Sequence, residues 1–209
     1  EEQVHGYLLS RGVADPLARR AARLAMGDAE EGYRLATDEQ AIARREMTTS
    51  LILNVRSISS AFSAAEKLTD LAEQDAQAVS AAKDERERAE LMALLGIREG
   101  ERVAPTLRAQ VRRLEDQQKR RAKRVASDTL LHSVAQVQTV LRDALTLSLS
   151  AQLPLINEHL REPLTAWCER RSPEQLLQDV QAVEITLRRL RTNANARLAL
   201  EALMSRFVY

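Results

Sequence analysis

The stretch that decides the fold is SPEQLLQDVQAVEITLRRLRTNANARLALEALMSRFVY, residues 172–209. It opens with a helix start, because Ser172 can cap, Pro173 suits the first helical position and Gln175 stands where a capping box requires it. Apolar residues then recur at alternating spacings of four and three, which places one apolar stripe on one helix face. The stripe consists of Leu176, Val180, Val183, Leu187 and Leu190.

A break and a second helix are expected next. Residues 191–195 contain Asn193 and Asn195, and Asn favours caps and turns over helix interiors. Asn195 is therefore predicted to cap a last helix, in which Ala196, Leu200, Leu203 and Phe207 resume the apolar stripe. Two packed helices close the chain, and their apolar faces need partners from upstream.

Composition limits the fold and the function. A chain of 209 residues with 44% hydrophobic and 29% charged residues, and with no clear strand signal, predicts an all-α protein of one large or two small domains. The net charge of +1 means that a basic partner surface can only be local. One cysteine excludes an internal disulfide and fits a reducing, cytoplasmic compartment. No apolar stretch is long enough for a membrane span. The first residue is Glu1 rather than Met, which favours a piece of a longer protein.

The first 38 residues are predicted to form a small three-helix subdomain. Gly12 and Gly27 end the first two helices, and Asp15-Pro16 begins the second. Leu17, Ala21 and Leu24 are expected on the buried face of that second helix. Thr37-Asp38 then caps a longer helix, so we place a domain boundary here, between residues 1–38 and a helical domain over residues 39–209.

A helical hairpin at about residues 80–128 is predicted to project from this second domain. A helix from Ser57 has Phe62 and Leu68 on its apolar face, but residues 83–88 are all charged. Gly96 to Pro105 is a predicted loop, and a long helix follows over about residues 106–150. Its apolar stripe is dense only from Leu130 onward, and Pro154 is expected to end it. A short helix around residues 163–170 precedes the closing pair.

Nothing in the sequence indicates an active site. It contains no glycine-rich phosphate loop and no Asp-rich metal motif. His5, His132 and His159 are scattered along the chain, and Cys168, next to Trp167, is predicted to be a buried structural thiol. The sequence therefore predicts no catalytic residue, no metal, no cofactor and no small-molecule substrate.

One helix could bind a polyanion. Its cations repeat at spacings of seven and four, which puts them on adjoining faces and suits phosphate contacts. No aromatic residue is interleaved for base stacking, and a solvated helix is the simpler interpretation. The candidate nucleic-acid contacts are Arg108, Arg112, Arg113, Lys119, Arg120, Arg121, Lys123 and Arg124.

Three segments resemble the C-terminal half of the delta-prime subunit of the bacterial DNA polymerase III clamp loader. They are residues 18–36 (ARRAARLAMGDAEEGYRLA), residues 141–147 (LRDALTL) and, most strongly, residues 172–209. The resemblance implies an AAA+ lid over residues 1–38 followed by a helical collar domain, which joins five subunits into the ring that loads the sliding clamp during DNA replication. It also implies other clamp-loader subunits as partners. The predicted hairpin lies outside the resemblance.

One position departs from the pattern of the relatives that hydrolyse ATP. In those proteins the lid helix after the glycine has an Arg that reaches the nucleotide, the sensor-2-like position. Counted from Gly27, that position holds Glu30, and Arg34 comes four residues too late. A carboxylate beside a triphosphate would be repelled, which suits a subunit without ATPase activity of its own.

Two functional hypotheses remain open from the sequence. The first is an oligomerisation module of the clamp loader. The second is a free-standing helical adaptor or coiled-coil protein that binds nucleic acid through the basic helix. An AAA+ core ahead of Glu1 in the full-length gene would favour the first hypothesis, and a native start near Glu1 would favour the second.

Overall fold

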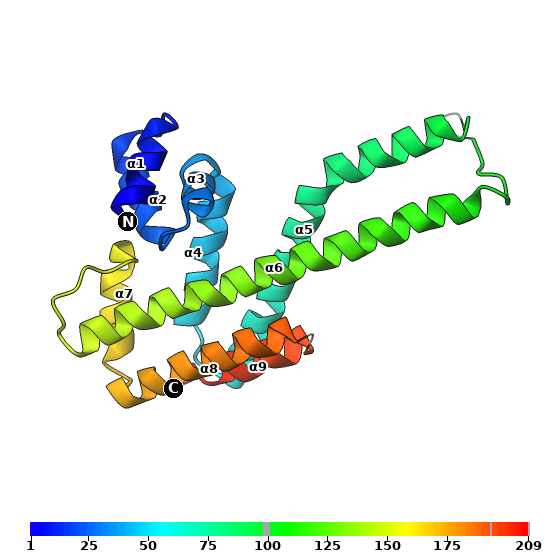
Figure 1. The fold of residues 1–209 in the computed structure, drawn as a ribbon. Helices are drawn as coiled ribbons and strands as arrows, with labels where there is room; N and C mark the ends of the chain where they lie inside the picture. Colours follow the sequence, from blue (N-terminus) through cyan, green and yellow to red (C-terminus); the bar gives the residue numbers. More distant parts are fainter. Residues whose placement is uncertain (98–100, 193, 209) are drawn as a thin grey trace. The chain divides into compact units, whose positions relative to one another are not determined.

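The computed structural model of the chain describes residues 1–97, 101–192 and 194–208, with the side chains of Asp75 and Val79 outside the description. Within these ranges every regular element is a helix, which confirms the all-α prediction (Figure 1). The chain forms two compact units. Unit 1 comprises Glu1–Ala65 and Ser133–Tyr209, and unit 2 comprises Glu66–His132. The predicted boundary at residue 38 and the projection of the hairpin stay predictions.

Three short helices open unit 1. They are α1 (Glu2–Ser10), α2 (Asp15–Leu24) and α3 (Ala29–Thr37), and they pack on one another. Gly12 and Gly27 have φ angles of +83° and +99°, a conformation that glycine adopts without steric cost, so they end α1 and α2 as predicted. Gly32 allows α1 and α3 to approach closely, because a Cβ there would lie 2.8 Å from Cγ1 of Val4.

Small residues build the core of these helices. Ala18, Ala21, Ala22 and Ala25 recur at spacings of three and one and are buried, whereas Leu17 is 52% exposed. The prediction for Leu17 is therefore wrong: the alanine face turns inward and leaves the leucine, one residue earlier, on the solvent side. The core consists of Val4, Leu8, Ala18, Ala21, Ala22, Leu24, Ala25, Leu35 and Ala41.

Two long helices follow α4 (Glu39–Leu53), which Asp38 caps by accepting a hydrogen bond from the Gln40 amide at 2.9 Å. The helix α5 (Ile58–Leu94) continues without a break through the charged residues 83–88. Phe62 on α5 is 45% exposed, so its predicted core position is wrong; Ala61, Ala64 and Ala65 are buried instead. The helix α6 (Arg108–Ser148) matches the predicted long helix but ends six residues before Pro154.

The chain closes with a 3₁₀ turn η1 (Glu158–Leu160) and the helices α7 (Arg161–Cys168), α8 (Pro173–Arg191) and α9 (Ala196–Ser205). The predicted capping box at Ser172 is present, with Gln175 as its partner. The side chain of Asn195 caps α9 by accepting a hydrogen bond from the Leu198 amide at 3.1 Å. Asn193 and Tyr209 lie outside the described residues. The α8 and α9 helices pack on each other, and their buried residues include Leu176, Val183, Leu187, Leu190, Leu200 and Leu203.

Unit 2 contains the second part of α5 and the first part of α6, which run antiparallel (Figure 1). The connection between them agrees with the predicted loop from Gly96 to Pro105 where it is described, and residues 98–100 lie outside the description. Gly96 has a φ of +69° just after α5 ends, as expected for a helix C-terminus. From residue 81 to residue 129 none of the described side chains is buried.

Candidate functional site

Asp143 on α6 organises a buried polar cluster in unit 1. Its side chain is fully buried, and its carboxylate accepts hydrogen bonds from the backbone amides of Ile156 and Asn157 at 3.0 and 2.6 Å. Arg142 donates to the same carboxylate at 2.8 Å and to the carbonyl of Pro154 at 2.7 Å. The Arg-Asp pair of the LRDALTL segment therefore fastens the chain after α6 back onto that helix.

Arg45 extends this cluster from α4. Its guanidinium donates to Oγ1 of Thr139 and to Oδ1 of Asn157, both at 3.1 Å. The side chain of Asn157 also donates to Asp143 at 2.9 Å. Burial lowers the pKa of Arg45, and the nearby carboxylates of Glu31 and Asp143 oppose that change. One hydrogen-bond network thus connects α4, α6 and the segment around Asn157. We interpret the network as structural, because its polar groups bind one another.

A second buried charge cluster connects α8 to the segment before it and to the residues after α9. Asp179 accepts a hydrogen bond from Arg171 at 2.6 Å and one from Arg206 at 3.1 Å. The guanidinium of Arg171 also lies 4.4 Å from the ring centroid of Trp167, in a cation–π contact. Burial raises the pKa of Asp179, although both guanidinium groups oppose the rise. The cluster holds the end of α7, the start of α8 and the residues after α9 together.

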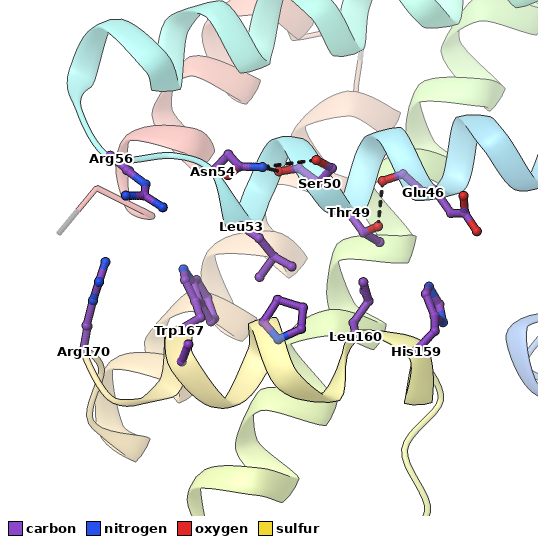
Figure 2. A pocket seen from close by; sticks show the side chains of 12 residues that line it. Glu46, Thr49, Ser50, Leu53, Asn54, Arg56, His159, Leu160, Trp167 and Arg170 are labelled. Carbon is purple, nitrogen blue, oxygen red and sulfur yellow. Dashed lines mark hydrogen bonds between the residues drawn. The ribbon is translucent and has the colours of Figure 1, made fainter.

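A hollow of about 550 Å³ lies between α4 and α7, within unit 1 (Figure 2). Leu53, Leu160 and Trp167 supply apolar walls. Figure 2 shows Arg56 and Arg170 at one end and Glu46 and His159 at the other. The indole Nε1 of Trp167 is buried without a hydrogen-bond partner among the described residues. The remaining lining residues are Thr49, Ser50, Asn54, Pro163 and Ala166.

The hollow has little of the chemistry of a catalytic site. Burial, and after it the positive charge of Arg20, lowers the pKa of His159, which favours the neutral imidazole. Two hydroxyls line the hollow: that of Thr49 donates to the Glu46 carbonyl at 2.9 Å, and that of Ser50 accepts a hydrogen bond from the Asn54 side-chain amide at 3.1 Å. The arrangement can accept an apolar group, and among the described residues no hydrogen bond joins Glu46 to His159.

Within unit 1, His5, His159 and Cys168 have different surroundings. His5 contacts Asp15 at 2.9 Å on the surface of the first helices, and His159 lies at the hollow. In the described part of the chain no three His, Cys, Asp or Glu residues are grouped so that they could hold a metal ion. Cys168 is partly buried and its thiol contacts the carbonyl of Ala144 at 3.3 Å. Burial raises the pKa of Cys168, which keeps it protonated and agrees with a structural thiol.

Glu30, which the resemblance puts at the sensor-2-like position, lies exposed on α3. The hydroxyl of Tyr7 donates to its carboxylate at 3.4 Å. Arg34, the later cation on the same helix, forms a two-bond ion pair with Glu31 at 2.7 and 2.9 Å. The described geometry therefore directs the Arg34 guanidinium to its own helix, and the role of Glu30 stays a prediction.

Arg121 differs from the other candidate nucleic-acid contacts on α6. It donates to both carboxylate oxygens of Glu87 at 2.9 and 2.6 Å and also pairs with Asp84. These hydrogen bonds, that of Glu87 first, raise the pKa of Arg121, and Arg121 in turn lowers the pKa of Glu87. Gln118 donates to the Asp84 carbonyl at 2.9 Å in the same contact. Arg121 thus joins the two helices of unit 2.

The other seven cations lie on the exposed side of α6. All seven side chains are exposed, and within the described ranges none of them forms an ion pair. We call this set the outer stripe: Arg108, Arg112, Arg113, Lys119, Arg120, Lys123 and Arg124.

Sequence reasoning missed Asp143, Arg45 and Asp179 as organising residues. Asp179 had a visible signal, because it stands three residues after Leu176 and four before Val183, on the apolar face of α8. A charged residue on such a face needs a buried partner. For Arg45 no comparable signal exists, since its partners lie 94 and 112 residues away in the chain.

Comparison with known families supports one assignment. Residues 122–208 match the family described as DNA polymerase III, delta subunit, C terminal. The match covers the second part of α6 through α9, including Asp143 and Asp179 but not Arg45. It supports a clamp-loader subunit family, and it does not distinguish delta from delta-prime. No curated protein and no solved structure matches the chain.

No helix in the described ranges combines the length and the apolar character that a bilayer crossing requires.

Proposed function

We propose that this chain acts as a delta-prime-type clamp-loader subunit, whose helical domain over residues 39–209 is a collar that joins it to the other subunits of the ring. The observation that supports this most directly is the family match over residues 122–208. Residues 18–36 resemble the lid of the delta-prime subunit, and for this reason we propose delta-prime rather than delta. In this role the chain contributes assembly, not catalysis, to loading of the sliding clamp during replication in the cytoplasm.

Exposed apolar side chains on the closing helices support a role in assembly. Leu177 and Ile185 on α8 and Leu198 on α9 are 54%, 40% and 63% exposed. Large apolar residues that stay in contact with water on packed helices are candidates for burial against a neighbouring subunit. We therefore place the subunit contact on the exposed sides of α8 and α9.

The test is assembly with purified partners. The chain is mixed with the other clamp-loader subunits encoded in the same genome, and native mass spectrometry measures whether a complex forms. A complex of defined stoichiometry is expected. The double variant Leu177→Asp, Leu198→Asp should weaken it at least about tenfold, because an interface cannot bury two unpaired carboxylates without loss.

A matched control is Leu149→Asp, since Leu149 is 61% exposed but lies outside α8 and α9. This variant should assemble like the unaltered chain. Absence of any complex with the clamp-loader subunits would contradict the proposed function. A complex that tolerates the double variant would contradict only the location of the contact.

A further inference from the structure

The first part of α6 has two chemically different sides within unit 2. One side is partly buried, with residues spaced by three and four so that they share one helix face. The residues of this inner side with that spacing are Val111, Leu114, Gln118, Arg121 and Val125, and the adjacent Glu115 and Ala122 are also partly buried. The cations of the outer stripe occupy the positions between them, on the opposite side. The inner side uses its one cation for pairing, and the outer side exposes seven.

The pairing of Arg121 fixes which side of α6 faces solvent. Its two hydrogen bonds to Glu87, together with the Gln118 contact to the Asp84 carbonyl, hold the inner side against α5. Rotation of α6 about its axis would break these contacts. The outer stripe is therefore presented outward by specific contacts and not by a loose helix. The structure therefore gives Arg121 a pairing role and leaves the outer stripe exposed, although the sequence alone groups all eight cations together.

The outer stripe does not follow the pattern of an ordinary solvated helix face. Such faces interleave opposite charges at spacings of three and four, which stabilises the helix. Here Arg112 has Glu115 and Asp116 at those spacings, yet no ion pair forms within the described residues. From Arg108 to Arg124 the stripe extends about 24 Å along the helix at 1.5 Å per residue. A linear array of unpaired cations of this length matches a linear polyanion.

Three features of the stripe decide among polyanions. Residues 66–132 contain no Phe, Tyr or Trp, so no ring is available to stack on the bases of a single strand. The stripe has no large apolar residue to insert into a lipid surface. Five of its seven cations are Arg, whose planar fork matches phosphate oxygens. An extended, regular row of phosphates is the chemistry that fits, and duplex DNA presents it.

We propose that the outer stripe of α6 binds the phosphodiester backbone of duplex DNA, independently of base sequence, and that Arg121 takes no part in this contact. Phosphate contacts position a protein on DNA and contain no sequence information. The proposal depends only on the geometry of unit 2, and it goes beyond the assembly role proposed for the closing helices.

The experiment measures binding of the 209-residue chain to a fluorescent 20-base-pair duplex between 50 and 200 mM salt. Each phosphate contact contributes about 0.9 to the slope of log K against log salt. The triple variant Arg112→Gln, Arg120→Gln, Arg124→Gln should therefore lower that slope by about 2.7 and weaken binding at 50 mM salt at least about tenfold. Replacement of the same three residues by Lys should retain nearly all of the slope.

Two control variants separate the stripe from other cations. Arg188, Arg189 and Arg191 on α8 are also exposed, and changing all three to Gln removes the same charge from unit 1. This variant should keep the slope and bind within about threefold of the unaltered chain. In Arg121→Gln the Gln118 contact to the Asp84 carbonyl still holds the inner side against α5, so this variant should likewise keep the slope, within about one contact. Circular dichroism verifies that each variant retains its helices; if the first triple variant does not, Arg108→Gln, Lys119→Gln, Lys123→Gln replaces it with the same expected result.

Several outcomes would overturn the proposal. They include the absence of duplex binding by the unaltered chain at 50 mM salt, and an unchanged slope for the two triple Gln variants of the outer stripe. If the α8 variant loses as much DNA affinity as the stripe variant, net charge and not the stripe decides binding. Tighter binding of a single strand, or equal binding of poly-glutamate, would assign the stripe to another partner. None of these outcomes bears on subunit assembly, which native mass spectrometry of the same variants should find unchanged.

Discussion

Unit 1 and unit 2 are both helical, but they differ in what holds their helices together. Unit 1 buries apolar side chains and also two carboxylates, Asp143 and Asp179, each with two or more hydrogen bonds. In unit 2 the helices meet between residues 81 and 129 through partly exposed contacts such as Arg121 with Glu87, and no described side chain there is buried. The helix α6 belongs to both units, so one part of this continuous helix is stabilised by buried contacts and the other part by partly exposed contacts.

The difference between the units indicates that the first part of α6 can form a helix without buried side chains. Residues 108–124 are mostly Arg, Lys, Gln, Ala, Leu and Glu, which have high intrinsic helix propensity. Such a segment forms a helix with one narrow contact face, and it leaves its other face free to bind a partner. The part from Val134 to Thr146 instead has apolar and polar residues fully inside unit 1. Stability is therefore expected to be concentrated in unit 1.

The largest expected effect tests the buried charge of unit 1. Asp179→Ala leaves the buried guanidinium of Arg171 without its carboxylate, and breaking a buried pair in this way costs about 3–5 kcal/mol of unfolding free energy. Urea denaturation followed by circular dichroism measures it. Glu87→Ala removes the corresponding carboxylate in unit 2 and should cost clearly less, because that pair is more exposed. Equal losses of unfolding free energy in Asp179→Ala and Glu87→Ala would show that the two units do not differ in this way.

The next effect tests the apolar core. Leu200 on α9 is fully buried, so Leu200→Ala should lower the unfolding free energy by about 2–5 kcal/mol. Leu187 on α8 is also buried, and its change to Ala should fall in the same range. Arg189, exposed on the same helix as Leu187, should change stability by under about 0.5 kcal/mol when replaced by Ala. A denaturant series on the three variants compares them, and similar values would show that the face assignment is wrong.

A deletion tests whether unit 1 depends on unit 2. Asp84 and Arg121 are ion-paired, so a short Gly-Ser linker can join residues 84 and 121 in place of residues 85–120. The main melting transition should shift by less than about 3 °C, equivalent to about 1 kcal/mol for a chain of this size, because little apolar surface is lost. Differential scanning calorimetry measures the shift. An unfolded product would mean that this segment supports the core of unit 1.

The last prediction concerns a residue that sequence reasoning placed in the core. Phe62 is 45% exposed on α5, so Phe62→Ala should change the unfolding free energy by no more than about 0.5–1 kcal/mol. Chemical denaturation alongside Leu200→Ala provides the comparison. A loss as large as that of Leu200→Ala would show that Phe62 is buried in solution, and it would restore the original prediction.

The sequence by itself determined the local features of this protein. The capping box at Ser172, the cap at Asn195 and the glycines that end α1 and α2 depend on contacts within a few residues, so the local pattern is sufficient to predict them. The periodicity of apolar residues likewise predicted the all-α fold and the buried faces of α8 and α9. For the candidate nucleic-acid contacts, the spacing of the cations showed that they share neighbouring faces of one helix.

Only the tertiary structure decided which residues meet across the chain. Whether Leu17 or its alanine neighbours turn inward depends on how closely α2 approaches α1 and α3. Arg45 finds its hydrogen-bond partners 94 and 112 residues away, and Arg121 is separated from its outward-facing neighbours only because Asp84 and Glu87 lie opposite it. Such contacts depend on the packing of distant segments, and helical periodicity contains no information about which segments those are.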